Sequence, residues 1–177
     1  NTAQVTNMDG TFAQAYAFNG NISSWNTAQV KRMGGGYGMF ESATSFNQSL
    51  SSWNTAQVTT MAWMFSGAYA FNQVISSWNT ALVADMDKMF SGASAFNQDL
   101  STWNTAKVKN MGDMFSSASA FNGDISNWNT AAVTTMSGMF ARASSFNKNL
   151  NSWNISSVTT TNEMFSSAVA FNGDTSS

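Results

Sequence analysis

The sequence predicts an α/β repeat solenoid, a right-handed coil with one short strand and one short helix in each 25-residue repeat. Three observations support this fold class. The tetrapeptide Trp-Asn-Thr-Ala recurs along the chain. Apolar residues in each repeat switch from a helical spacing to a strand-like alternation. The repeat also covers all 177 residues, so we expect one solenoid without a separate tail or linker.

The repeat boundaries follow from the Trp-Asn step. Cutting before each Asn gives seven units, 1-25, 26-53, 54-78, 79-103, 104-128, 129-153 and 154-177. Their consensus is N-T-A-x-V-x-x-M-x-x-M-F-x-x-A-x-x-F-N-x-x-(L/I)-S-x-W. The second unit is three residues longer, and the extra residues fall in the segment Gly34–Gly38. Repeats of this length suggest one supersecondary unit each, because a single unit cannot bury its apolar face alone.

The helix is predicted from the middle of each unit. In unit 104-128, Met111, Met114, Phe115 and Ala118 stand at i, i+3, i+4 and i+7, which is one face of a two-turn helix. The same spacing recurs in units 54-78 and 129-153. So short a helix is marginal by itself, so we expect packing against neighbouring units to stabilise it.

The strand is predicted before this helix. Leu100, Trp103, Thr105 and Val108 follow the inward positions of the leucine-rich-repeat pattern, with Asn104 facing the opposite way. Stacking of the units would then place equivalent residues in columns. We expect columns of Val, of Trp and of two Phe positions in the core, with Met filling the gaps between rings.

Composition excludes several classes of site. The chain has no His, Cys or Pro, only 9% charged residues and a net charge of -2. Imidazole triads, thiol enzymes, zinc fingers and disulfide scaffolds are therefore excluded. No basic surface for nucleic acid is expected. The longest clean apolar run, Met61–Phe65, is too short to span a membrane. No nucleophile, base and orienting group can be assembled by spacing, so we expect no enzyme, cofactor or metal site.

The repeat resembles a known family. The string M-F-x-x-A-x-x-F-N-x-x-L-S-x-W-N-T-x-x-V-x-x-M is similar to BspA-like leucine-rich-repeat surface proteins, in the branch first described as a mycoplasma domain of unknown function. The residues that carry the match in one repeat are Met89, Phe90, Ala93, Phe96, Asn97, Leu100, Trp103, Asn104, Thr105, Val108 and Met111. The resemblance implies a leucine-rich-repeat-like solenoid, an extracellular or cell-surface location and an adhesive or binding role.

Two series of asparagine recur in every repeat. The first, called the Asn ladder below, follows the second Phe and consists of Asn19, Asn47, Asn72, Asn97, Asn122, Asn147 and Asn172. We interpret it as an inward structural ladder that caps backbone groups of turns, with a ligand site as the alternative. The second, called the outer Asn row, consists of Asn1, Asn26, Asn54, Asn79, Asn104, Asn129 and Asn154. It should point outward, either as stacked amides that bond to one another or as a recognition surface.

A candidate binding face follows from the outward positions of the predicted strands. It contains Asn26, Asn54, Asn79, Asn104, Asn129 and Asn154, together with Ser52, Ser77 and Thr102 from the position before Trp. The face is small, uncharged and regular. Such a lattice suits a repetitive ligand, either a polysaccharide or an ice plane.

The remaining motifs favour structural interpretations. Gly34–Gly38 lacks the Lys-Ser/Thr of a phosphate loop and is interpreted as a loop insertion between strand and helix. Asp99 and Asp124 share a repeat position and could share a calcium ion, but a solvated turn is the better interpretation. Lys107 and Lys109 fit a solvated face. Asn21, Asn47 and Asn154 lie in glycosylation sequons, which chance explains in so Asn- and Ser-rich a chain.

Two functions therefore remain from the sequence. The first is a non-catalytic extracellular structural or adhesive repeat segment that mediates protein or surface interactions. Its partners would be other protein chains or surface glycans. Neither end resembles a polar cap, so the chain is expected to belong to a longer array or to associate end to end into a fibre. The alternative is a binding module that holds a repetitive ligand on the Asn/Ser/Thr-rich face.

Overall fold

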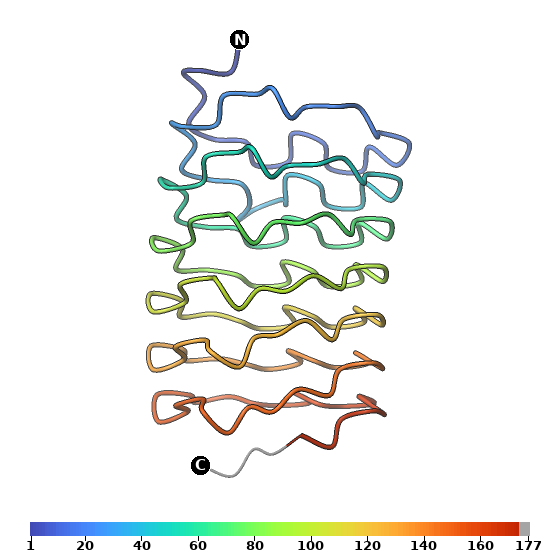
Figure 1. Cartoon of the computed structure of the whole chain (residues 1–177), viewed down its shortest axis with the longest axis vertical. Coiled ribbons are helices and arrows are strands. Elements are labelled where there is room, and N and C mark those ends of the chain that lie inside the picture. The colour runs from blue at the N-terminus through green and yellow to red at the C-terminus, as the bar shows by residue number, and fades with distance from the viewer. Residues whose placement is uncertain (174–177) are drawn as a thin grey trace.

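Seven flattened coils lie one above another along the long axis of the protein, with the N-terminal coil and the C-terminal coil at opposite ends of the stack (Figure 1). This computed structural model describes residues 1–173. We number the coils 1 to 7 in the order of the seven repeat units. Adjacent coils are joined in register by six parallel bridges, which link Asn7, Arg32, Thr60, Asp85, Asn110, Thr135 and Thr160 in sequence.

The predicted α/β fold class is wrong. Residues 1–173 contain no helix, and the only strand-like residues are the single bridge positions, one per coil. The protein is therefore not a leucine-rich-repeat-like solenoid with one strand and one helix per repeat. Each coil is instead a succession of tight turns joined by short extended segments.

The backbone at two equivalent positions explains why no helix forms, and both positions have positive φ in every coil except coil 2, where only the second does. In coil 5 the φ angles of Asp113 and Ser117 are 49° and 59°, whereas an α-helix needs φ near about −63° at every residue. Phe115 N–H donates to Met139 of the next coil, not to Met111 four residues back. Met114 and Ala118 donate to the residue three positions earlier. The turns thus keep an i, i+3 spacing of buried residues, which looks helical in the sequence.

The predicted alternation at Trp-Asn-Thr is confirmed, but it does not produce a strand. Trp103 and Thr105 are buried while Asn104 is exposed. The Thr105 hydroxyl donates to the carbonyl of Asn129, 3.0 Å away in the next coil. Here a side-chain hydroxyl donates to the backbone carbonyl of the next coil, whereas in a regular strand ladder a backbone N–H would donate to it.

The core is a set of side-chain columns that run through the stack. The predicted Phe columns are confirmed, since rings of the Phe12 to Phe165 series lie 5.4–5.8 Å apart from coil to coil. Within one coil the two Phe rings are closer, at 3.8–4.1 Å. Indole rings stack at 6.3–6.5 Å in four of the coil contacts. Offset ring pairs of this kind add about 0.5–1.5 kcal/mol each beyond the burial of area.

The Trp column also carries hydrogen bonds. The indole N–H groups of Trp53, Trp78, Trp103, Trp128 and Trp153 each donate to a backbone carbonyl of the preceding coil at 3.0–3.2 Å. The acceptors are the Leu or Ile residues three positions before the preceding Trp, such as Ile75 for Trp103. Each indole therefore fills the core and satisfies a buried carbonyl at the same time.

Candidate functional site: the side faces and ends of the stack

The outer Asn row lies on the surface, with all seven residues exposed. Each side-chain oxygen accepts the backbone N–H two residues further on, at 3.0–3.1 Å. This is the Asx-turn arrangement, and the stacked amides do not bond to one another within residues 1–173. The amide nitrogens have no hydrogen-bond acceptor in the described part of the chain, so their N–H groups face solvent.

The hydroxyl groups of the candidate binding face are already used as donors. Ser52, Ser77 and Thr102 are exposed, and each hydroxyl donates to a carbonyl of the preceding coil at 2.7–3.1 Å. Their oxygens keep lone pairs toward solvent. The face therefore presents amide donors beside hydroxyl acceptors, at positions fixed by bonds within each turn and between coils.

The Asn ladder connects adjacent coils. The side-chain oxygen of each member accepts the backbone N–H of the next member at 2.8–3.0 Å, in six successive steps. Its members are half-buried or exposed, so they lie at the surface and not inward as expected. Three Gln side chains, Gln48, Gln73 and Gln98, add a second bond to the same oxygens. The Phe-Asn-Gln tripeptide in three adjacent units was the sequence signal for them.

The acidic positions cap turns. The Asp99 and Asp124 carboxylates accept the N–H groups of Ser101 and Ser126 at 2.8 and 2.9 Å. The bond from Ser126 lowers the pKa of Asp124 below its ordinary value. No group of three acidic residues in 1–173 could hold a metal ion together.

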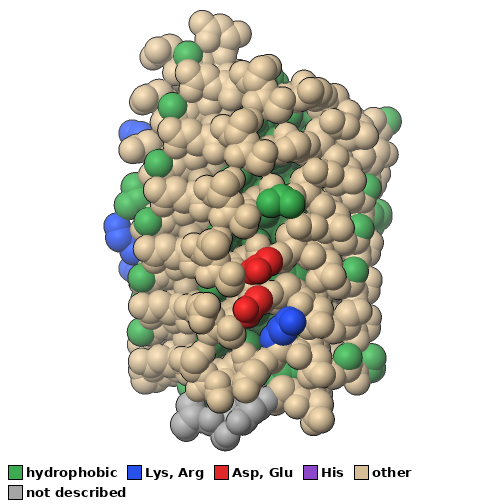
Figure 2. Space-filling view, in the orientation of Figure 1, with side chains coloured by type: hydrophobic (Ala, Val, Ile, Leu, Met, Phe, Trp, Pro, Cys, Tyr) green, Lys and Arg blue, Asp and Glu red, His purple; other side chains and the backbone are tan. Residues whose placement is uncertain are grey.

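A small charged cluster was not found from the sequence. The Lys88 ammonium lies 4.3 Å from the centre of the Trp63 ring and 3.9 Å from the Asp113 carboxylate. Burial raises the pKa of the neighbouring Asp87, and the nearby Lys88 lowers it by less. The face drawn in Figure 2 is mostly uncharged, apart from a few acidic and basic side chains near its middle and basic ones at one edge. The cluster depends on contacts between coils, which spacing within one repeat does not reveal.

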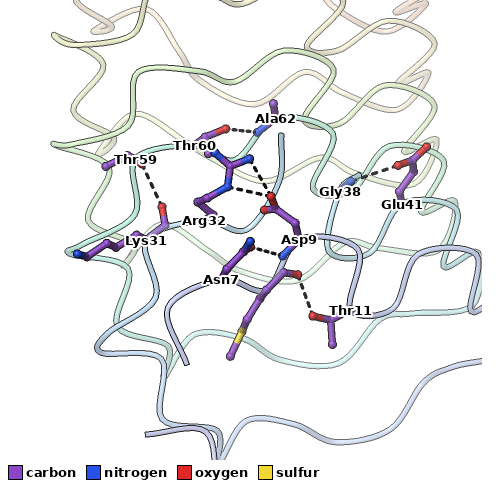
Figure 3. A network of polar contacts seen from close by, with 11 residues as sticks. Asn7, Asp9, Thr11, Lys31, Arg32, Gly38, Glu41, Thr59, Thr60 and Ala62 are labelled. Carbon is purple, nitrogen blue, oxygen red and sulfur yellow. Dashed lines mark hydrogen bonds and ion pairs between the residues drawn. The ribbon is translucent and has the colours of Figure 1, made fainter. Parts of the chain in front are cut away.

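The insertion in coil 2 is a loop against coil 3. A Cβ atom at Gly34 would overlap the carbonyl of Ala62, and one at Gly38 would overlap that of Trp63. Glycine is therefore required there by close approach of two backbones. Beside the loop, the Arg32 guanidinium bonds to Asp9 at 2.8–2.9 Å, and Gly38 N–H donates to Glu41 (Figure 3). Among the buried side-chain polar atoms of residues 1–173, one oxygen of Asp9 lacks a hydrogen-bond partner.

The remaining predicted residues lie on the surface. Lys107 and Lys109 are exposed. Asn21 and Asn154 are exposed, with their side-chain oxygens capping the N–H groups of Ser23 and Ser156. Asn47 is half-buried in the Asn ladder. The sequons therefore coincide with turn-capping or ladder positions.

The outer coils leave the core partly open. In coil 1, Val5, Phe12, Phe18 and Trp25 are only partly buried, although their equivalents in coils 2 to 6 are buried. At the other end lies a cavity of about 370 Å³, lined by Leu150, Trp153, Ile155, Met164, Phe165 and four further residues. Ile155 replaces a Thr that is buried in coils 2 to 6, yet it is 53% exposed. Each end of the stack thus presents core side chains of its last coil.

A family model supports the repeat assignment. The family is described as "Mycoplasma protein of unknown function, DUF285", and its model matches residues 1–100 and 73–177. The chain belongs to this family. No curated protein matches the DUF285 chain. The family description gives no activity, so the resemblance to BspA-like proteins remains a prediction. No helix in the described residues is long and apolar enough to cross a membrane.

Proposed function

We propose that this DUF285 chain is a non-catalytic structural or adhesive repeat segment that contacts other proteins or surface glycans at the cell exterior. The observation that supports this function is the continuity of the core. Ring columns and hydrogen bonds between coils connect coil 1 to coil 7 without interruption. A stack held in this way keeps its surface rows at fixed spacing, which suits many weak contacts along one side.

The composition of the surface adds to the argument. With 9% charged residues and a net charge of -2, the chain offers little electrostatic steering. The exposed rows consist mainly of amide and hydroxyl groups. Adhesion through such rows would depend on the number of contacts and would change little with ionic strength. The likeness to BspA-like surface proteins points to the same role and to the same extracellular location.

The test is an adhesion measurement with beads. Beads coated with the chain, and control beads coated with albumin, are exposed to a panel of protein- and glycan-coated surfaces under flow. We expect retention above the albumin control on at least one surface, with little change when salt is raised. Retention equal to the control on every surface would contradict the proposed function.

A second candidate is the binding of a repetitive ligand, a polysaccharide or an ice plane, on the outer Asn row. The free amide N–H groups of this row favour it, because they recur once in every coil. Glycan-array binding and thermal hysteresis test the two ligands separately. Changing Asn79 and Asn104 to Asp together should abolish the signal, because each loses its amide donor. An unchanged signal in that variant, or no signal from the unmodified chain, rules this candidate out.

A further inference from the structure

The hydrogen bonds between coils have a direction. The turn region is the segment equivalent to residues 111–118 of coil 5. There, the backbone N–H groups that bond to another coil all donate to the coil that follows. Phe140 and Arg142 of coil 6 donate to Met164 and Ser166 of coil 7 at 2.8 and 2.7 Å. The equivalent bonds recur at each coil contact from coil 1 onward. In such a stack, the turn-region N–H groups of the last coil have no following coil to donate to. The turn-region carbonyls of the first coil have no preceding coil to accept from.

The unpaired groups at the two ends follow from this direction. In coil 7, the N–H groups of Glu163, Phe165 and Ser167 donate to nothing within residues 1–173. In coil 1, the equivalent acceptors, the carbonyls of Thr11 and Ala13, accept nothing within the same residues. A turn-region surface rich in N–H groups therefore lies at one end, and the matching carbonyl-rich surface lies at the other.

In a second region, represented in coil 7 by residues 159 and 172, backbone N–H groups donate to the preceding coil instead. Thr159 N–H donates back to Thr134, and Asn172 N–H donates back to the Asn147 side chain. The equivalent donors in coil 1 are the N–H groups of Thr6 and Asn19, which have no acceptor within residues 1–173. In this region the first coil supplies donors and the last coil supplies acceptors.

We propose that two copies of the 177-residue chain associate head to tail, with coil 1 of one copy seated on coil 7 of the other. This interface would repeat the contact that already occurs between successive coils within the chain. The donors of each end face the acceptors of the other in both regions. The partly open Phe12, Phe18 and Trp25 would cover the exposed core of coil 7, including Phe165 and Ile155. Two like ends with the same regions aligned would instead place donors against donors, and acceptors against acceptors.

The same geometry determines the form of the assembly. A contact between two different surfaces of one chain leaves a free copy of each surface at the ends of the pair. Assembly along the stack axis therefore continues into an open filament and does not close at a dimer. This inference rests on the proposed structural role, since it names a second copy of the chain as one of its protein partners.

The test uses sedimentation of the whole chain and three variants with the same charge change. Val5→Lys alters the coil 1 end and Ile155→Lys the coil 7 end, while Gln57→Lys is the control on the exposed side of a central coil. We expect the unmodified chain and the control to form species larger than a dimer as concentration rises. Each end variant alone should lose association at least about tenfold, because a buried ammonium would lack a partner.

The decisive measurement is an equimolar mixture of Val5→Lys and Ile155→Lys. Each variant keeps the end that the other lacks, so the mixture should form a heterodimer and nothing larger. An unmodified chain that stays a 19.0 kDa monomer overturns the inference. An end variant that still dimerises alone overturns it too, because the contact would then join like ends. Thermal unfolding of each variant verifies that it is folded.

The outcome is separable from that of the proposed function. The end variants have intact side rows, so bead adhesion can be measured on them as monomers. If the unmodified chain adheres but does not associate, the head-to-tail contact is refuted and the proposed function stands. If the unmodified chain associates but adheres to no surface, the proposed function is refuted and the head-to-tail contact stands.

Discussion

The change Ser117→Gly distinguishes the turn structure from the helix that the sequence suggests. Ser117 has a φ of 59°, and Gly67 and Gly92 occupy the same position in coils 3 and 4 with φ of 68° and 72°. A left-handed conformation costs a residue with a Cβ about 1–2 kcal/mol. Glycine removes this cost but loses about 0.5–1 kcal/mol through its greater freedom in the unfolded chain. We therefore expect a net gain of roughly 0.5–1 kcal/mol in the free energy of unfolding.

The matched control is Ser116→Gly, at the adjacent residue. Ser116 is also half-buried but is not among the residues with positive φ. Glycine there should destabilise the protein by about 0.5–1 kcal/mol, because only the entropy cost remains. Urea unfolding followed by tryptophan fluorescence measures both changes. If both variants lose stability equally, as glycine in a helix would, the turn assignment is refuted.

Three further predictions address packing, capping and charge. Phe90→Ala should lower the free energy of unfolding by about 3–5 kcal/mol, because the Phe90 ring is fully buried against four other rings. Phe12→Ala in coil 1 should lower it clearly less, because Phe12 is only partly buried. Equal losses in urea unfolding would contradict the column model. Asn97→Ala should lower the free energy of unfolding by about 1 kcal/mol or more, because the Asn122 N–H loses its acceptor in the preceding coil. Asn104→Ala should lower it less, because its exposed side chain caps an N–H within one turn. The opposite order in calorimetry would argue against the Asn ladder. The raised pKa of Asp87 means that the folded state binds its proton more tightly, so its contribution to stability should fall as pH rises from about 3.8 through the folded-state pKa. Asp87→Asn should then stabilise the protein at neutral pH and lose this advantage in acid, and a pH-independent difference in melting temperature would refute that sign.

The periodicity of the sequence was enough to define the repeat, its boundaries and most of the core. Every apolar consensus position except the Ala that follows Asn-Thr is buried in the central coils, and the Phe columns lie where the spacing indicated. Apolar residues that recur at the same position of every repeat indicate that this position is buried, and a tandem repeat shows such positions in a single sequence. The outward position of Asn104 between Trp103 and Thr105 was predictable for the same reason.

Secondary structure was not predictable in the same way. Buried residues at i, i+3, i+4 and i+7 fit a two-turn helix, and they fit two successive tight turns equally well. The choice depends on whether Phe115 N–H finds its acceptor four residues back or in the next coil, and it takes Met139. That contact joins residues 24 positions apart, so no window within one repeat contains it.

The sequence by itself determined the repeat, the columns of the core and the family to which the chain belongs. Only the tertiary structure decided the conformation of each coil and the direction of its hydrogen bonds. The physical reason is that a backbone N–H in this protein is satisfied about equally well within a turn or between coils. Stacking at a fixed spacing selects between the two, and it also leaves donors at one end of the protein opposite acceptors at the other in each region of the coil.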